Sequence, residues 1–115
     1  MSKRDWKLFV EDILECVQKI EKYVQDMELE DFKESDITID AVLRNLEIIG
    51  EAARNIDINI RKQYNDIPWQ DIVDFRNRIT HGYFTISLPI IWQIIKQELP
   101  PLKEKLNRIL EESEQ

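Results

Sequence analysis

The chain has 115 residues, of which 43% are hydrophobic and 34% are charged, with two glycines and four prolines. This length suffices for a core that needs no disulfide or metal, and we expect residues 1–115 to form a single helical domain. The net charge of −7 argues against a general nucleic-acid-binding protein with a broad basic face. The segment 61–84 is the one part of the chain without an excess of acidic residues, since it holds four basic residues against three acidic ones.

Cysteine usage and hydropathy bear on the compartment. Cys16 is the only cysteine and lies in an apolar periodic stretch, so we interpret it as a buried core residue of a protein in a reducing compartment. The N-terminal residues lack the apolar core of a signal peptide, and no window reaches the ~18 apolar residues of a membrane span. We therefore expect a cytoplasmic protein without a membrane partner.

The first half of the chain predicts two long helices. Apolar residues recur at alternating spacings of three and four over residues 6–27, which is typical of a helix packed in a bundle. The acidic run at 28–34 predicts a loop or short turn. Ser35 and Asp36 can both cap a second helix, which the spacing extends to Ile56.

The middle of this second helix has small side chains at Gly50, Ala52 and Ala53. Glycine inside a helix costs about 1 kcal/mol relative to alanine. We therefore expect these residues to let another helix come close, and that helix can belong to a second subunit.

Residues 57–67 predict a short helical piece and a turn. Pro68 is suited to the first position of a third helix, because its fixed φ fits and its missing amide is not needed there. This helix carries Arg76 on or beside its buried stripe. Gly82 is suited to end it, which places His81 in the closing turn.

The last segment keeps a helical spacing of apolar residues over 88–109, across Pro100 and Pro101. Two prolines remove amides from a helix and clash with its preceding turn, so we expect a break or kink near Leu99 and a short last helix from Pro101 to about residue 111. Strand-like alternation is absent. The predicted fold is all-α, an up-and-down bundle of four to five helices.

One segment concentrates the residues suited to chemistry. The sequence RNRITHGY, residues 76–83, holds the only histidine, two arginines and a tyrosine. Histidine exchanges protons near neutral pH, and arginine is a permanent forked cation that suits phosphate oxygens. Neither His-Glu-x-x-His, nor Cys-x-x-Cys, nor a glycine-rich nucleotide loop is present, so we expect no metal and no cofactor. The pattern predicts phosphodiester chemistry on RNA, whose 2′-hydroxyl is a built-in nucleophile.

Arg76 and His81 would be the catalytic pair, with His81 taking the 2′-hydroxyl proton or protonating the leaving 5′-oxygen and Arg76 stabilising the transition state. The products would be a 2′,3′-cyclic phosphate and a 5′-hydroxyl. On an ideal helix the two residues differ by about 140° in direction and about 7.5 Å in height. Either the helix unwinds at His81, or a dimer brings together the arginine of one chain and the histidine of the other. Asn77 can orient the imidazole or hold a phosphate oxygen, and Arg78 meets another phosphate or water.

Each of these residues also has a structural interpretation. His81 can belong to a helix cap. Arg76 can be a buried structural arginine paired with Asp74 or a glutamate. Tyr83 and Phe84 can be hydrophobic anchors of the next segment.

Five blocks of the chain, in one order and over nearly its whole length, resemble a known family. They are NLEIIGEAA at 45–53, IPW at 67–69, RNRITHGY at 76–83, IWQII at 91–95 and LP at 99–100. They are similar to the HepT-like toxins of the HEPN superfamily, small helical ribonucleases encoded beside minimal nucleotidyltransferase antitoxins.

The resemblance implies the toxin of a toxin–antitoxin system, a metal-independent endoribonuclease that acts as a homodimer with Arg76 and His81 catalytic near the subunit cleft. It implies an antitoxin that transfers AMP from ATP to Tyr83 and a larger hetero-oligomer with it. A rival from another class is a non-catalytic HEPN-type module that binds the nucleotidyltransferase or RNA. A third possibility is a helical scaffold whose dimer is its whole function.

Overall fold

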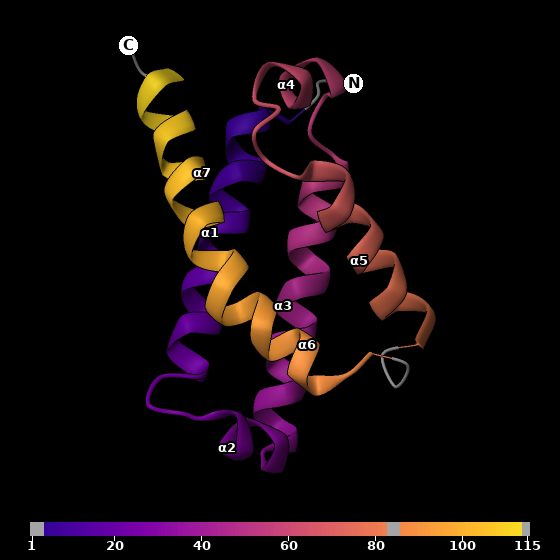
Figure 1. The fold of residues 1–115 in the computed structure, drawn as a ribbon. Coiled ribbons are helices and arrows are strands. Elements are labelled where there is room, and N and C mark those ends of the chain that lie inside the picture. Colours follow the sequence, from indigo (N-terminus) through magenta and orange to yellow (C-terminus); the bar gives the residue numbers. More distant parts are fainter. Residues whose placement is uncertain (1–3, 83–85, 114–115) are drawn as a thin grey trace.

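The computed structural model describes residues 4–82 and 86–113, and within them every regular element is helical. The elements are α1 (Trp6–Tyr23), α2 (Leu29–Glu34), α3 (Asp36–Arg54), α4 (Ile58–Gln63), α5 (Trp69–Gly82), α6 (Leu88–Gln93), the π-helical stretch η2 (Ile94–Glu98) and α7 (Leu99–Ser113). Since α6, η2 and α7 are continuous, four long segments run alternately down and up in Figure 1, joined in part by the short α2 and α4. The all-α prediction is confirmed. The described residues form six helical segments, against the four or five expected, because α2 and α4 are separate short helices.

The first helix is shorter than its apolar spacing suggests. The Asp5 carboxylate accepts the Lys7 amide hydrogen bond at 3.0 Å and caps its start. Its end is Tyr23, not residue 27, because the chain turns away through Asp26, whose φ of 64° lies in the left-handed region. Val24, which follows the helix, is still only 3% exposed. The apolar spacing therefore predicts which residues are buried, but it does not show where the helix ends.

The acidic run expected as a loop or turn is the short helix α2. Its first turn is stabilised by the Asp31 carboxylate, which accepts the Glu28 amide at 2.9 Å. Phe32 is fully buried, and its ring centroid lies 5.2 Å from that of Trp92. Phe32 therefore anchors this mostly acidic segment, and the partly buried Leu29 also packs against the core.

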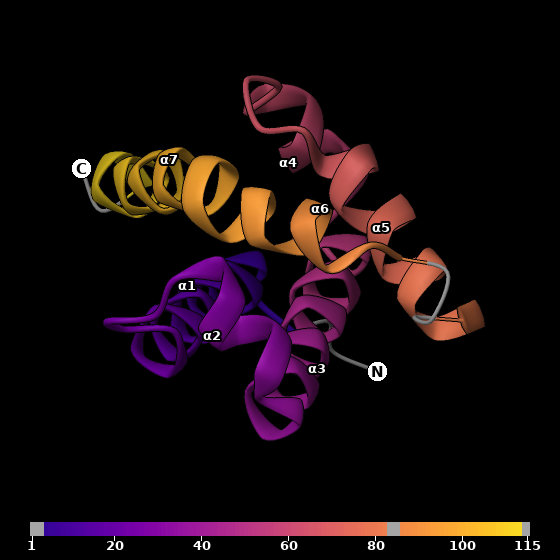
Figure 2. The ribbon, with the colours of Figure 1, turned by 60° about the horizontal axis from the view of Figure 1, so that its bottom comes forward.

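The central helix is α3, which lies between α1 and α5 in Figure 2 and packs on both. It begins as predicted, with the Ser35 hydroxyl accepting the Thr38 amide at 3.3 Å. A Cβ at Gly50 would lie 2.1 Å from the Cβ of Arg76. The close neighbour of the small-residue segment is thus α5 of the same chain.

The start of α5 is one residue later than expected. Pro68 precedes the helix, and its carbonyl accepts the Ile72 amide at 3.1 Å. The indole of Trp69 donates to the carbonyl of Tyr64 at 3.0 Å, which ties the helix to the turn before it.

The chain does not break near Leu99, where a break or kink was expected, and the last helix begins at Leu99 and not at Pro101. The chain widens instead into η2, where the Leu99 amide bonds to the carbonyl of Ile94. Pro100 and Pro101 then occupy the first turn of α7, directly after the widened turn. The wider turn lets the chain stay helical up to the two prolines, which were expected to break it.

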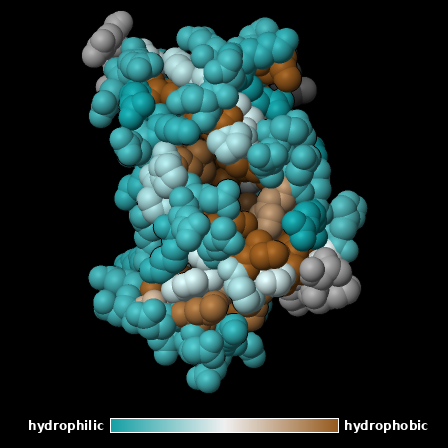
Figure 3. Space-filling model, in the orientation of Figure 1, coloured by the Kyte–Doolittle hydropathy of each residue, from teal (hydrophilic) through white to brown (hydrophobic). Residues whose placement is uncertain are grey.

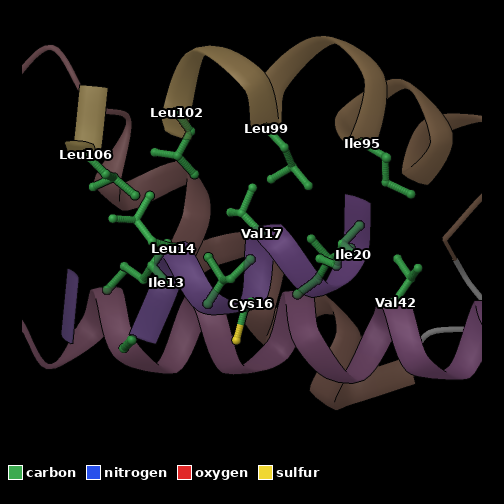
Figure 4. Packing of buried hydrophobic residues seen from close by; sticks show 14 of the residues in the cluster. Ile13, Leu14, Cys16, Val17, Ile20, Val42, Ile95, Leu99, Leu102 and Leu106 are labelled. Atoms are coloured by element: carbon green, nitrogen blue, oxygen red, sulfur yellow. The ribbon is translucent and has the colours of Figure 1, made fainter. Parts of the chain in front are cut away.

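The core lies mainly between α1, α3 and the η2–α7 segment. Figure 4 shows the side chain of Val17 on α1 pointing toward Leu99, and that of Leu14 pointing toward Leu102 and Leu106. Cys16 is buried among them as expected, and burial raises the pKa of its thiol. No helix that the structure describes is long and apolar enough to cross a membrane.

Candidate active site

Arg76 projects from α5 toward α3, with its side chain 21% exposed. Its Nη2 lies 3.0 Å from Oε2 of Glu51, and its Nη1 donates to Oδ1 of Asn77 at 3.1 Å. Its Nε is buried without a hydrogen-bond partner. The interpretation of Arg76 as paired with a glutamate is correct, and the partner is Glu51 of α3 and not Asp74.

His81 is exposed in the last turn of α5. The helix stays regular through this residue and ends at Gly82, whose φ is 153°. The Thr80 hydroxyl also bonds to the carbonyl of Arg76 at 3.0 Å. The helix therefore does not unwind at His81, which was one of the two arrangements foreseen, and Arg76 and His81 leave it about 140° apart.

Asn77 lies beside Arg76, whereas Arg78 lies at a different surface of α5. Asn77 contacts the guanidinium of Arg76, which makes it a support for the arginine in this structure. The guanidinium of Arg78 lies 5.9 Å from the ring centroid of Phe75, at an apolar groove of about 510 Å³ between α5 and the η2–α7 segment. Figure 3 shows this groove as a brown hollow. Arg78 is thus kept apart from Arg76, as the helical spacing predicts.

Tyr83, the expected AMP acceptor, and Phe84 lie outside the described residues. Among the residues that are described, no group of three or more histidine, cysteine or acidic side chains is placed to hold a metal ion.

A second hollow, of about 400 Å³, lies beside Arg76. Arg4 and Arg44 line it together with Arg76, and Glu51 lines it from α3. Sequence reasoning missed Glu51 and these two arginines. The signal for Glu51 was a charged residue between Gly50 and two alanines, on the stretch of α3 that another helix was expected to approach.

The fold and the site define a small helical domain whose exposed histidine and ion-paired arginine share one helix. The family model described as Ribonuclease HepT-like matches residues 13–109, and the chain belongs to this family.

Curated relatives agree with this assignment. A protein of Thermococcus cleftensis named probable ribonuclease HepT is 36% identical over 107 residues, covering 93% of this chain and 97% of that protein. A putative RNase of Methanocaldococcus jannaschii is 38% identical over 106 residues, covering 92% of this chain and 97% of that protein. A second protein of that organism, named gamma-glutamylcyclotransferase and putative RNase, is 38% identical over 96% of this chain, which spans only 50% of it. No solved structure matches the chain significantly.

Proposed function

We propose that the chain is a metal-independent endoribonuclease in which Arg76 and His81 are catalytic. The observation that carries the proposal is that Arg76 is held by an ion pair and His81 is exposed in a member of the Ribonuclease HepT-like family. The guanidinium of Arg76 is held at the edge of a hollow, and the imidazole of His81 is exposed on the same helix. An exposed imidazole can reach a substrate proton, and an oriented guanidinium can stabilise charge on a phosphate.

The chemistry needs one histidine and one arginine at the same phosphate. His81 takes the proton of the 2′-hydroxyl, or donates one to the leaving 5′-oxygen, while Arg76 neutralises the charge that builds on the phosphorus-bound oxygens. Since α5 stays helical between the two residues, we propose that they meet in a homodimer, with Arg76 of one subunit facing the partner subunit's His81.

The test is cleavage of RNA by the purified full chain in the presence of EDTA. We expect the wild type to leave 2′,3′-cyclic phosphate ends, and Arg76→Ala and His81→Ala each to lower the rate by about 100-fold or more. Circular dichroism should show that both variants keep the helical fold. Loss of cleavage in EDTA would contradict the metal-free mechanism, and a fully active His81→Ala variant would contradict the catalytic role.

We further propose that the chain is a toxin of a cytoplasmic toxin–antitoxin pair, which a nucleotidyltransferase neutralises by transferring AMP to Tyr83. AMP two residues from His81 would place negative charge where a substrate phosphate must bind. We expect Tyr83→Phe to keep nuclease activity and to escape the antitoxin. The control is Tyr23→Phe, at an exposed tyrosine on α1, which should remain sensitive. Normal silencing of the Tyr83→Phe variant would contradict this proposal.

A second candidate is a non-catalytic module that binds RNA or the nucleotidyltransferase. The pairing of Arg76 with Glu51 favours it, because an arginine with a structural partner need not touch substrate. Expression of the wild type and of His81→Ala without any antitoxin separates the two. Equal growth of both strains favours the module, and growth rescued by the substitution favours the ribonuclease.

A further inference from the structure

The hollow beside Arg76 brings together guanidinium groups from three parts of the chain. Arg4 precedes α1, Arg44 belongs to α3 and Arg76 belongs to α5. Its volume of about 400 Å³ is in the range of sites that bind small organic ligands. Asp12, Glu47 and Glu51 line it too, so a phosphate of a nucleic acid can bind there only to an arginine that leaves its carboxylate partner.

The three arginines differ in how firmly a carboxylate holds them. Arg4 lies 2.6 Å from Asp12, and its guanidinium also lies 4.8 Å from the ring centroid of Phe9, so it has two partners. Arg76 lies 3.0 Å from Glu51.

Arg44 has the weakest hold of the three, with 3.9 Å between its Nη1 and the Oε1 of Glu47 and with 69% of its side chain exposed. Exposed pairs of this kind contribute little free energy, so Arg44 can exchange its carboxylate for another anion at small cost.

The spacing along α3 connects Arg44 to the candidate site. Arg44 and Glu51 are seven residues apart, which puts them on the same side of the helix and about 10 Å apart along its axis. Ile48 lies between them and also lines the hollow. Along α3 the lining runs from Arg44 to Asn55, and Arg76 reaches Glu51 between them, so Arg44 and Arg76 line the same hollow.

We infer that this hollow is a subsite for the RNA backbone, in which Arg44 binds a phosphate that neighbours the one held by Arg76. The inference rests on the proposed ribonuclease function. The carboxylate of Glu47 competes with the RNA phosphate for Arg44, so binding replaces an intramolecular ion pair by an intermolecular one.

The experiment measures binding of a short single-stranded RNA to the full chain by fluorescence anisotropy over a range of salt concentrations. All variants carry His81→Ala so that the RNA stays intact. We expect Arg44→Gln to weaken binding about tenfold at low salt. It should also reduce the slope of log Kd against log salt by about 0.7, the value for one phosphate contact on a single strand. Glu47→Gln should strengthen binding, because it removes the competing carboxylate.

The matched control is Arg108→Gln on α7. Arg108 is also exposed and also pairs with a glutamate of its own helix, Glu104, at 3.2 Å, but it does not line the hollow. The same loss of affinity in Arg44→Gln and Arg108→Gln would overturn the subsite, since the effect would then be one of net charge. An unchanged salt slope in Arg44→Gln, or weaker binding by Glu47→Gln, would overturn it as well.

The outcome is separable from that of the proposed function. Cleavage is measured on chains with His81 intact. A wild type that fails to cut RNA while Arg44→Gln lowers the salt slope refutes the ribonuclease and supports the subsite. A wild type that cuts RNA while Arg44→Gln binds like Arg108→Gln refutes only the subsite.

Discussion

The guanidinium of Arg76 is held by groups of two helices, Glu51 of α3 and Asn77 of its own helix. A planar fork with two fixed contacts loses little conformational entropy when it meets a phosphate. The sequence indicated that a carboxylate could pair with Arg76, but it could not show which one. Glu51 is 25 positions away, and only the packing of α5 on α3 brings it within reach.

Gly50 sets the distance between α3 and α5 at this point. In Gly50→Ala the new Cβ would meet the Cβ and Cγ of Arg76 at 2.1 Å and 2.7 Å, so the helices must separate. We expect a loss of about 1–3 kcal/mol in the free energy of unfolding, measured in urea, although alanine is the better helix former. RNA cleavage should fall too, because Arg76 is displaced.

The control is Asp40→Ala, at an exposed position of the same helix, which should change stability by no more than about 0.5 kcal/mol. A Gly50→Ala variant as stable as the wild type would show that the two helices part without cost.

At the scale of the elements, local signals predicted α3 well and the C-terminal segment less well. Ser35 and the three–four spacing give the start and the buried face of α3. The same spacing cannot distinguish α-helix from the π-helical η2, because one widened turn leaves the apolar residues on the same side. The two prolines predicted a break in the helix, but the chain instead forms the widened turn η2 directly before them.

The cap of α3 gives a test of local stability. In Ser35→Ala the amide of Thr38 loses its side-chain acceptor, and we expect unfolding in urea to show a loss of about 1 kcal/mol. Ser35→Asp restores an acceptor and should stay close to the wild type. If Ser35→Asp were as unstable as Ser35→Ala, the hydrogen bond would not be the cause.

At the scale of the whole molecule, the proposed pairing of Arg76 with the partner subunit's His81 predicts that two inactive variants complement each other. In a mixture of Arg76→Ala and His81→Ala chains, half of the dimers are mixed and each mixed dimer keeps one intact shared site. We expect recovery of about a quarter of the wild-type cleavage rate, while each variant alone stays inactive. The measurement is RNA cleavage after the two chains are unfolded and refolded together. No recovery would place both residues of the site in one subunit.

The position of α5 has a consequence for heat inactivation. This helix packs mainly on α3, with Trp69, Val73 and Ile79 as its buried side chains, and a groove opens on its other side. Regions with few buried contacts open at lower free energy than the rest of the fold. On heating, cleavage should therefore be lost before the far-ultraviolet circular dichroism of the bundle, and amides of α5 should exchange with solvent faster than those of α1. Coincident curves would mean that α5 unfolds only with the whole domain. Separated curves would mean that α5 unfolds at a lower temperature than the rest of the domain.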